Sequence, residues 1–435
     1  MQDILKKVKG RVDSAEVFYM KSHRTEVGYE GWKLKKSSVV QKEGFSLRVV
    51  KDGRVGFSAT TDMNAIDDMI DNAVATAKYG EIVDLKFPGQ GQFADINLFD
   101  DKLDALTIPD IIEFGKIFID KSEPFRGIAD LNFDSTRSIL EVKLANSSGF
   151  DSGYRKTYLS WSGSLHRVKE NDVFLLWDGS ARTSLPDMEA EILKMTEPFE
   201  EKMRLADNLV DISTGKMPVV FSPRGTLVVL LPLNAAINGR SVYTGSSPLV
   251  GKEGQKLFDE HLTVVDDGTL PGGIGSAPFD DEGTPKRRIP IVEKGVFKNF
   301  LFDNVTAAKS GRESNGCADR GIFSAPSPGT SNLAVEKGKV SKEEIVSSID
   351  NGILVDGVLG MGQGNIISGT FSNPFGAVFK IENGELVGRV KDGTIAGNIY
   401  NDLREIAAVG DKQETVYGSF HAPYIRVDSL TVTGK

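Results

Sequence analysis

Histidine and cysteine are common zinc ligands, and this chain of 435 residues has only four histidines and one cysteine, Cys317. Zinc hydrolysis requires ligands that converge on one ion, commonly two histidines on one helix face with an adjacent glutamate as general base. The four histidines are His23, His166, His261 and His421. No two of them lie within one helical turn, and none is followed by glutamate. The chain therefore has no recognisable zinc motif, although the stretch DEHLTVVDD, residues 259–267, leaves a metal site around His261 open.

Two other residues could serve as nucleophiles, which need an activated hydroxyl or thiol. Ser213 and Lys216 match the spacing Ser-x-x-Lys, in a segment that resembles a linker between domains. Cys317 lies near Arg312 and Arg320, which could stabilise a thiolate, but no histidine lies close to it in the sequence. The chain also lacks a Gly-x-Ser-x-Gly elbow. These residues leave a stand-alone hydrolase open as an alternative, although no complete catalytic motif indicates one.

Two loops have the composition of ligand-binding segments. GMGQGN, residues 360–365, resembles a phosphate-binding loop, but the following NIISGTFS has the pattern of a strand where the dinucleotide fingerprint requires a helix. We therefore reject a dinucleotide site there. FDDEGTPKRR, residues 279–288, places three carboxylates before a glycine, a threonine and a proline. It is either a solvated turn or a cleft wall whose carboxylates and backbone groups meet a ligand.

The overall composition excludes several classes of protein. Lys and Arg number 52 and Asp and Glu 61, so the formal net charge of −9 argues against a nucleic-acid backbone as partner. The single cysteine cannot form an internal disulfide, which fits a reducing compartment. The N-terminal stretch MQDILKKVKG lacks an apolar signal core, and the longest apolar run, LVVLLPLNAAI, is too short to span a bilayer. We expect a cytoplasmic protein that binds neither nucleic acid nor membrane.

The pattern of elements predicts an α+β fold. Residues 15–60 and 126–182 alternate and turn like antiparallel strands, with Lys51–Asp52–Gly53 as a hairpin turn. Amphipathic helices are expected over residues 62–80, 107–123 and 187–207.

After residues 208–217 the composition shifts to short strands separated by glycine turns. Asn383–Gly384 and Asp392–Gly393 each predict a type I′ hairpin. We expect an N-terminal α+β domain over residues 1–210, with antiparallel strands and long helices, followed by a β-rich domain over residues 211–435. The second domain should be a barrel or a sandwich.

The stretch SPRGTLVVLLPLNAAINGRS, residues 222–241, predicts a buried helix at the head of the second half. Ser222 suits the N-cap position and Gly239 the end of the helix. Leu230 and Leu231 should both be buried. The stretch contains no His, Glu, Asp, Cys or Lys, so by itself it indicates only a core helix.

Several stretches, taken together and in order, resemble the TldD/PmbA family of peptidases, the modulators of DNA gyrase. They are LTVVDDGTL, SAPFDDEGTP with the following IVEKGVFKNFLFD, the loop around GRESNG, GNIISGTFS, and the C-terminal RVDSLTVTGK. The N-terminal hairpins up to GRVGFSAT and the helix after them are also similar to that family. The resemblance spans nearly the whole chain.

The resemblance also indicates which kind of member this is. TldD-like members carry a helical His-Glu-x-x-x-His motif before the VVDDGT-like segment and a cysteine shortly before the last strand, and these residues bind zinc. Here residues 230–237 stand where the histidines and glutamate would be required, and Val409 or a neighbour stands in place of the cysteine. The chain therefore resembles the PmbA (TldE) kind, which keeps the fold without the metal site.

The resemblance implies a subunit that assembles with a TldD-like zinc subunit to degrade unfolded proteins or peptides, and that can form a homodimer when isolated. This chain would be the non-catalytic subunit, acting in substrate enclosure and scaffolding, with zinc on its partner and no catalytic residue, metal ligand or cofactor of its own. A peptide-binding module without a protease partner is a further alternative. The candidate substrate-binding residues are Phe279, Asp280, Asp281, Glu282, Gly283, Thr284, Ile367, Ser368 and Gly369.

Overall fold

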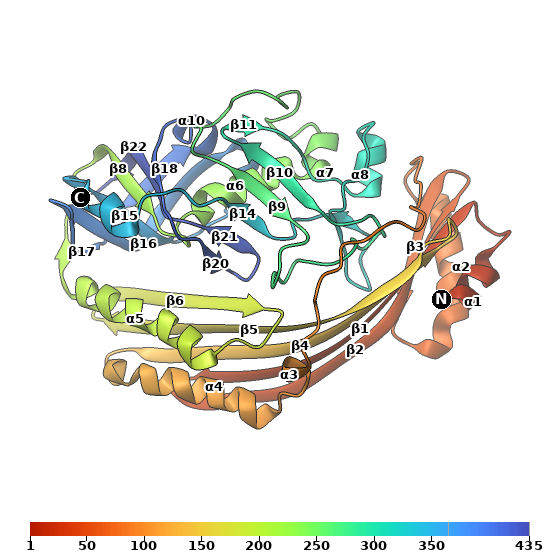
Figure 1. Ribbon diagram of the computed structural model, residues 1–435, viewed down its shortest axis with the longest axis horizontal. Helices are drawn as coiled ribbons and strands as arrows, with labels where there is room; N and C mark the ends of the chain where they lie inside the picture. Colours follow the sequence, from red (N-terminus) through yellow and green to blue (C-terminus); the bar gives the residue numbers. More distant parts are fainter. Residues whose placement is uncertain (364, 435) are drawn as a thin grey trace.

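The first half of the chain forms one long antiparallel sheet. The computed structural model describes residues 1–363 and 365–434, so Gly364 of the GMGQGN stretch and the terminal Lys435 lie outside it. The strands follow the order β3-β2-β1-β4-β5-β6. Their bounds are β1 (Ser14–Glu30), β2 (Lys33–Lys51), β3 (Arg54–Thr60), β4 (Asp130–Asn146), β5 (Asp151–Lys169) and β6 (Asp172–Arg182). The sheet curves beneath the second half of the chain (Figure 1).

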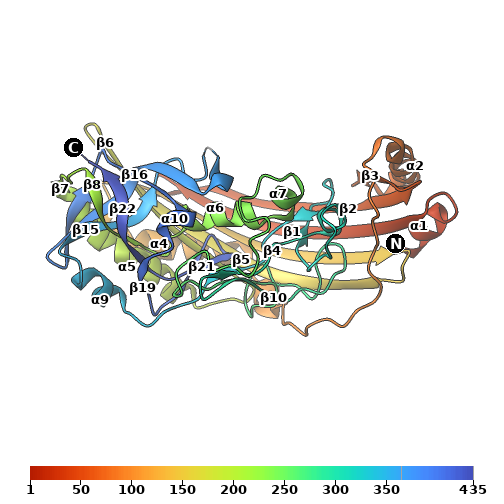
Figure 2. The ribbon, with the colours of Figure 1, turned by 90° about the horizontal axis from the view of Figure 1, so that it is seen from above.

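Two helices pack on this sheet, and the second of them also contacts the second half of the chain (Figure 1). They are α4 (Ile108–Lys121), which begins with a capping box between Thr107 and Asp110, and α5 (Met188–Asp207), which Asp187 caps. Phe118 of α4 stacks on Phe133 of β4 in the core beneath. The shorter α1 (Gln2–Val8) and α2 (Ile66–Thr76) lie at the end of the sheet far from the C-terminal half (Figure 2), and α3 (Asp101–Asp104) lies in the connection before α4.

The second half is built around a closed set of strands. These strands follow the order β15-β8-β22-β18-β16, and a β15–β16 pairing closes the ring. Their bounds are β8 (Gly215–Phe221), β15 (Asn351–Val358), β16 (Thr370–Glu382), β18 (Thr394–Asn398) and β22 (Ile425–Thr433). The strands β7 (Leu209–Val210), β17 (Glu385–Val390) and β19 (Ile406–Val409) pair at its margins. The predicted α+β fold with a β-rich, barrel-containing region is confirmed, whereas the proposed division at residue 210 stays a prediction.

A second, six-stranded sheet lies between the barrel and the long N-terminal sheet (Figure 1), in the order β11-β10-β9-β14-β21-β20. Its strands are β9 (Val264–Asp267), β10 (Arg288–Glu293), β11 (Val296–Phe297), β14 (Leu333–Val335), β20 (Glu414–Val416) and β21 (Phe420–Ala422). The remaining elements of this half are α6 (Leu227–Ile237), α7 (Gly239–Tyr243), α8 (Asn304–Lys309), α9 (Lys342–Ser347), α10 (Ile399–Asp402), β12 (Ala318–Asp319) and β13 (Ser327–Pro328). The family-like segments of the sequence are therefore distributed over both layers of the second half.

Two of the three predicted hairpin turns are confirmed. Asp52 and Gly53 adopt positive φ angles between β2 and β3, and Asn383 and Gly384 do so between β16 and β17. The turn at Asp392 was predicted wrongly as a hairpin, because β17 and β18 both pair with β16 and not with each other. A turn sequence reports a local reversal of the chain, and it cannot report which strand the returning segment will pair with.

The predicted core helix is α6, and it begins later than expected. Residues 223–226 form turns, and the hydroxyl of Ser222 accepts a hydrogen bond from the Gly225 amide at 3.1 Å, inside the turn and not as a helix cap. Leu230 is buried in the main core, but Leu231 is only partly buried beside Met361, so the prediction for Leu231 was wrong. At 11 residues α6 is too short for a bilayer, and no other described helix combines the length and apolarity needed to cross one.

Four buried ionic side chains join the two halves of the chain. Arg48 of β2 contacts Glu282 at 2.5 Å and Glu16 of β1 at 3.1 Å, and Arg320 donates to the same Glu16 at 2.8 Å. The side chains of all four residues are at most 1% exposed. Burial raises the pKa of Glu282, and Arg48 opposes that shift by favouring the charged carboxylate.

The different exposure of two neighbouring leucines gives a first prediction. Leu230→Asp should destabilise the fold by about 4 kcal/mol or more, because the new carboxyl group would be buried without a partner. Leu231→Asp should cost only about 1 kcal/mol, because its side chain reaches partly into solvent. Urea denaturation of both variants measures the difference. Equal losses would contradict the placement of α6.

The buried ionic group gives a second prediction. Arg48→Met should lower the free energy of unfolding by about 3–5 kcal/mol, because it leaves Glu282 buried without its counter-ion. The control is Arg11→Met, which removes a surface pair with Asp71 whose side chains are 43% and 69% exposed. That control should cost less than about 1 kcal/mol. Urea denaturation compares the two, and a loss for Arg48→Met as small as that of the control would refute the role of the group.

Candidate functional site

The FDDEGTP turn is buried between the two halves, so it is not a solvated turn. Phe279 is 1% exposed and packs into a cluster of aromatic rings on the N-terminal half. Its ring lies 5.1 Å from Phe150, 5.2 Å from Phe93 and 5.4 Å from Tyr154. The turn therefore docks the second half onto the sheet and its preceding connection.

Backbone hydrogen bonds hold the turn in place. The Asp280 carboxylate accepts from the amides of Glu282 at 3.0 Å, Thr284 at 2.9 Å and Ala318 at 3.0 Å. Burial raises the pKa of Asp280 to about 6, although these amides favour its charged form. Gly283 has a φ of 87°, and a side chain there would also meet the Phe150 ring at 2.9 Å. The residue types of the turn are thus accounted for by packing, and their contact with substrate stays a prediction.

The second predicted segment lies elsewhere. Ile367 and Ser368 belong to a single 3-10 turn, η4 (Ile366–Ser368), beside α6, so the prediction that NIISGTFS is a strand throughout was wrong. The strand β16 begins only at Thr370, because Gly369 adopts a φ of 79° and ends the turn. The cavity beside Asp281 and the small cavity beside Ile366 share no lining residue. The structure does not bring the two predicted segments to one cavity, and whether either segment binds substrate stays a prediction.

The segment where the resemblance would require the zinc helix ligands, residues 230–237, is apolar except for Asn234 and contains no His, Glu, Asp or Cys. Leu230, Leu233 and Val409 are buried in the same core. Their side chains have no atom that can ligate zinc or activate water, so these residues do not fit the ion. Among the described residues, no group of three or more His, Cys, Asp or Glu side chains could hold a metal.

The other candidate residues are dispersed. His261 is exposed and lies 2.7 Å from the Asp259 carboxylate. Cys317 is buried, and burial raises the pKa of its thiol well above the usual value, which disfavours the nucleophilic thiolate. Ser213 and Lys216 are both exposed. None of these placements provides an activated nucleophile with an adjacent base.

A cleft of about 510 Å³, which no sequence pattern predicted, lies between the two halves. One wall comes from β6 and α5, and the other from residues 222–224, Asp356 and residues 410–415. Arg224 contributes a largely buried cation to this cleft and contacts Asp356 at 2.6 Å just before α6. The only signal in the sequence is an arginine between proline and glycine at the head of an otherwise apolar helix.

A fixed ion pair network forms the floor of this cleft. Lys202 of α5 also contacts Asp356, at 2.8 Å. Burial alone would raise the pKa of Asp356, but Arg224 and Lys202 outweigh it and hold that pKa below its usual range. On the same cleft, burial and Asp178 raise the pKa of Glu414. The cleft thus presents both signs of charge, which suits a polar, extended ligand better than an apolar one.

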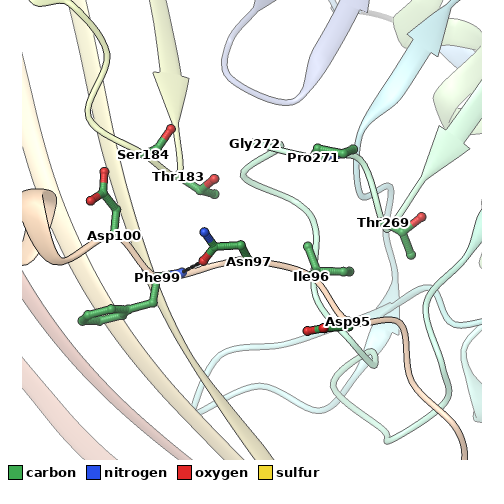
Figure 3. Close-up of a pocket in the computed structure, with 10 residues that line it drawn as sticks. All are labelled: Asp95, Ile96, Asn97, Phe99, Asp100, Thr183, Ser184, Thr269, Pro271 and Gly272. Atoms are coloured by element: carbon green, nitrogen blue, oxygen red, sulfur yellow. Dashed lines mark hydrogen bonds between the residues drawn. The ribbon is translucent and has the colours of Figure 1, made fainter.

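A smaller cavity of about 280 Å³ lies where the connection before α3 passes between the halves (Figure 3). Asn97 and Asp100 come from this connection, and Thr183 and Thr269 from the two halves. Asp100 accepts a hydrogen bond from the Leu185 amide at 2.7 Å, which ties the connection to the segment after β6. The described residues that line this cavity include no cationic side chain but two carboxylates, Asp95 and Asp100, which disfavour an anionic ligand.

Comparisons with known proteins identify the family. Residues 214–434 match the PmbA/TldA metallopeptidase C-terminal domain, and residues 15–77 match the PmbA/TldA metallopeptidase domain 1. A metalloprotease of Methanothermobacter thermautotrophicus is 26% identical over 94% of this chain and 90% of its own length. The metalloprotease PmbA of Escherichia coli O157:H7 is 32% identical over 47% of this chain and 43% of its own length.

The fold agrees with these matches over its whole length. The crystal structure of TldE from Thermococcus kodakarensis superposes with a TM-score of 0.91 at 26% identity, and the match covers 100% of both chains. One matched domain covers the barrel and α6, and the other covers the strands β1 to β3. The chain belongs to the PmbA/TldD family of metallopeptidase-related proteins.

Proposed function

We propose that the chain is a TldE-like, non-catalytic subunit of a metalloprotease that degrades unfolded proteins or peptides. The observation that carries this proposal is the apolar packing of Leu230, Leu233 and Val409, which lie in the two segments where the resemblance would require zinc ligands. The fold around those positions is retained, with a TM-score of 0.91 to TldE of Thermococcus kodakarensis. A retained fold without the groups that polarise a carbonyl or activate water is expected of a scaffolding subunit.

The zinc subunit would be a separate TldD-like chain. Related chains can share one self-complementary interface, so a pair of unequal subunits, or a homodimer of this chain alone, is expected from the same surface. We also propose a cytoplasmic location, with which the acidic composition and the single buried cysteine are consistent.

Substrate enclosure is best supported at the charged cleft beside Arg224. The cleft lies between the halves, and its lining residues 222–224 come just before α6 in the chain. The resemblance equates α6 with the zinc helix of TldD-like members. Of the predicted binding residues, Ser368 is exposed and available to a ligand, whereas Phe279 and Glu282 act first in docking the halves. Asp281 is the one acid of the turn that lines a cavity.

Reconstitution tests the proposed function. The chain alone should not cleave casein or an unstructured peptide, because it has no activated nucleophile and no zinc ligands. Mixed with a TldD-like zinc subunit, it should give cleavage that a chelator abolishes and that exceeds the activity of the zinc subunit alone. The measurement is release of peptides from the substrate.

Two variants separate this function from its alternatives. Cys317→Ala and Ser213→Ala should leave the activity of the mixture unchanged. Cleavage by this chain alone that either variant abolishes would instead establish a stand-alone hydrolase. Binding of the unstructured peptide without any stimulation of the zinc subunit would establish a peptide-binding module that works without this partner.

A further inference from the structure

A second cavity, of about 310 Å³, lies between the long sheet and the C-terminal half. Its floor is apolar and comes from β1 and β4 of the sheet. The floor residues are Phe18, Met20, Leu140 and Val142. Its opposite wall comes from two loops of the C-terminal half, residues 274–286 and 317–330. This volume is at the lower end of the range of small-molecule sites, about 300–1,000 Å³, and it suits a ligand of few atoms.

Lys156 of β5 brings a cation into this cavity. The residue is 6% exposed, and its ammonium donates to the carbonyl oxygens of Ile274 and, at 2.8 Å, of Ser276. An ammonium has three donors, so one is left for a ligand. Burial, reinforced by Lys286 and opposed by Asp281, lowers the pKa of Lys156 to about 7. A buried lysine without a carboxylate partner is costly, and an anionic ligand would relieve that cost.

Asp281 supplies an anion on the opposite wall. One of its oxygens accepts the Arg320 amide at 2.9 Å, and the carboxylate lines the same cavity as Lys156. Burial raises the pKa of Asp281 to about 6, with Arg320 opposing this shift and Asp319 adding to it. Asp281 raises the pKa of Lys156, yet the salt bridges of the described residues include none between these two side chains. Both groups line the same cavity, so a ligand bound in it would lie near a cation and an anion.

Two further cations line the cavity: Lys286, which donates to Ser331 at 2.6 Å and to the Gly275 carbonyl at 3.3 Å, and Arg320, which is incompletely paired. The side chain of Arg320 is 1% exposed and lines the cavity. Its Nη1 binds Glu16, but its Nε and Nη2 have no hydrogen-bond partner among the described residues. Tyr154 and Tyr158 complete the rim, and burial followed by Asp281 raises the pKa of Tyr154 well above its usual value, so it is a neutral donor. Buried donors without partners are rare, and they indicate a ligand or ordered water.

We propose that this cavity binds a small zwitterion with an apolar side chain, either a free α-amino acid or a dipeptide. The carboxylate of the ligand would bind Lys156, and its ammonium would bind Asp281. The apolar floor between these charges would hold an aliphatic side chain. Cys317 lines the same cavity but takes no part, because it is a buried neutral thiol. The proposal does not depend on the proteolytic assembly, since the purified chain alone carries every residue involved.

Isothermal titration calorimetry of the purified chain with blocked and unblocked ligands tests this proposal. Leucine and leucyl-leucine separate the two sources of the zwitterion, and binding of either one supports the site. Leucyl-leucinamide lacks the carboxylate, and N-acetyl-leucyl-leucine lacks the ammonium. Each blocked form should bind at least about tenfold more weakly than leucyl-leucine, since each loses one charge-assisted contact. Absence of binding by both unblocked ligands, or equal binding of blocked and unblocked forms, would overturn the proposal.

Two substitutions assign the two ends. Lys156→Met should remove the preference for the free carboxylate over the amide, and Asp281→Asn should remove the preference for the free ammonium over the acetylated form. Lys143→Met is the control, because Lys143 is a 53% exposed lysine on the neighbouring strand β4. It should change neither preference. If Lys156→Met does not fold, the ligand series on the unaltered chain still decides the proposal. A folded Lys156→Met that keeps the full preference would refute the assigned orientation.

Discussion

The architecture depends on charges that are buried where the two halves of the chain meet. Arg48 and Glu16 come from the long sheet, and Glu282 and Arg320 come from the C-terminal half. Ions taken out of water are tolerated only when partners meet them with good geometry, so this group is stable only in the assembled arrangement. It thereby favours one relative position of the halves. The charged cleft and the Lys156 cavity both lie between the same halves and depend on that position.

The turn that carries Glu282 has the residue types of a binding site, but most of its side chains hold the two halves of the chain together. Its phenylalanine enters an aromatic cluster, its first aspartate binds backbone amides, and its glutamate neutralises Arg48. Among the acidic residues of this turn, only Asp281 lines one of the cavities described above. A cluster of acids in a sequence is therefore weak evidence for a site until the partners of each carboxylate are known.

Local features of the fold were predicted well. The helices expected over residues 107–123 and 187–207 form as α4 and α5, and the turns at Asp52 and Asn383 form as predicted. The turn at Asp392 was read wrongly, since strand pairing overrode the local hairpin signal. The helix α6 was recognised, but it begins only at Leu227, after the turns of residues 223–226. Leu231 lies beside Met361 and Ile366, and no local pattern encodes that proximity.

The sequence by itself determined the α+β class, the acidic surface charge, the lack of a zinc motif and the similarity to the PmbA/TldD family. These features follow from composition and from residues close to one another in the chain. Only the tertiary structure decided which charges are buried and paired. Arg48 and Glu282 are separated by 234 positions in the sequence. Lys156 and the Ser276 carbonyl to which it donates are separated by 120 positions. Such contacts are set by how the halves pack. Arg48 stands out between Leu47 and Val49, whereas nothing in the stretch GYRKTYL around Lys156 indicates that this lysine is buried.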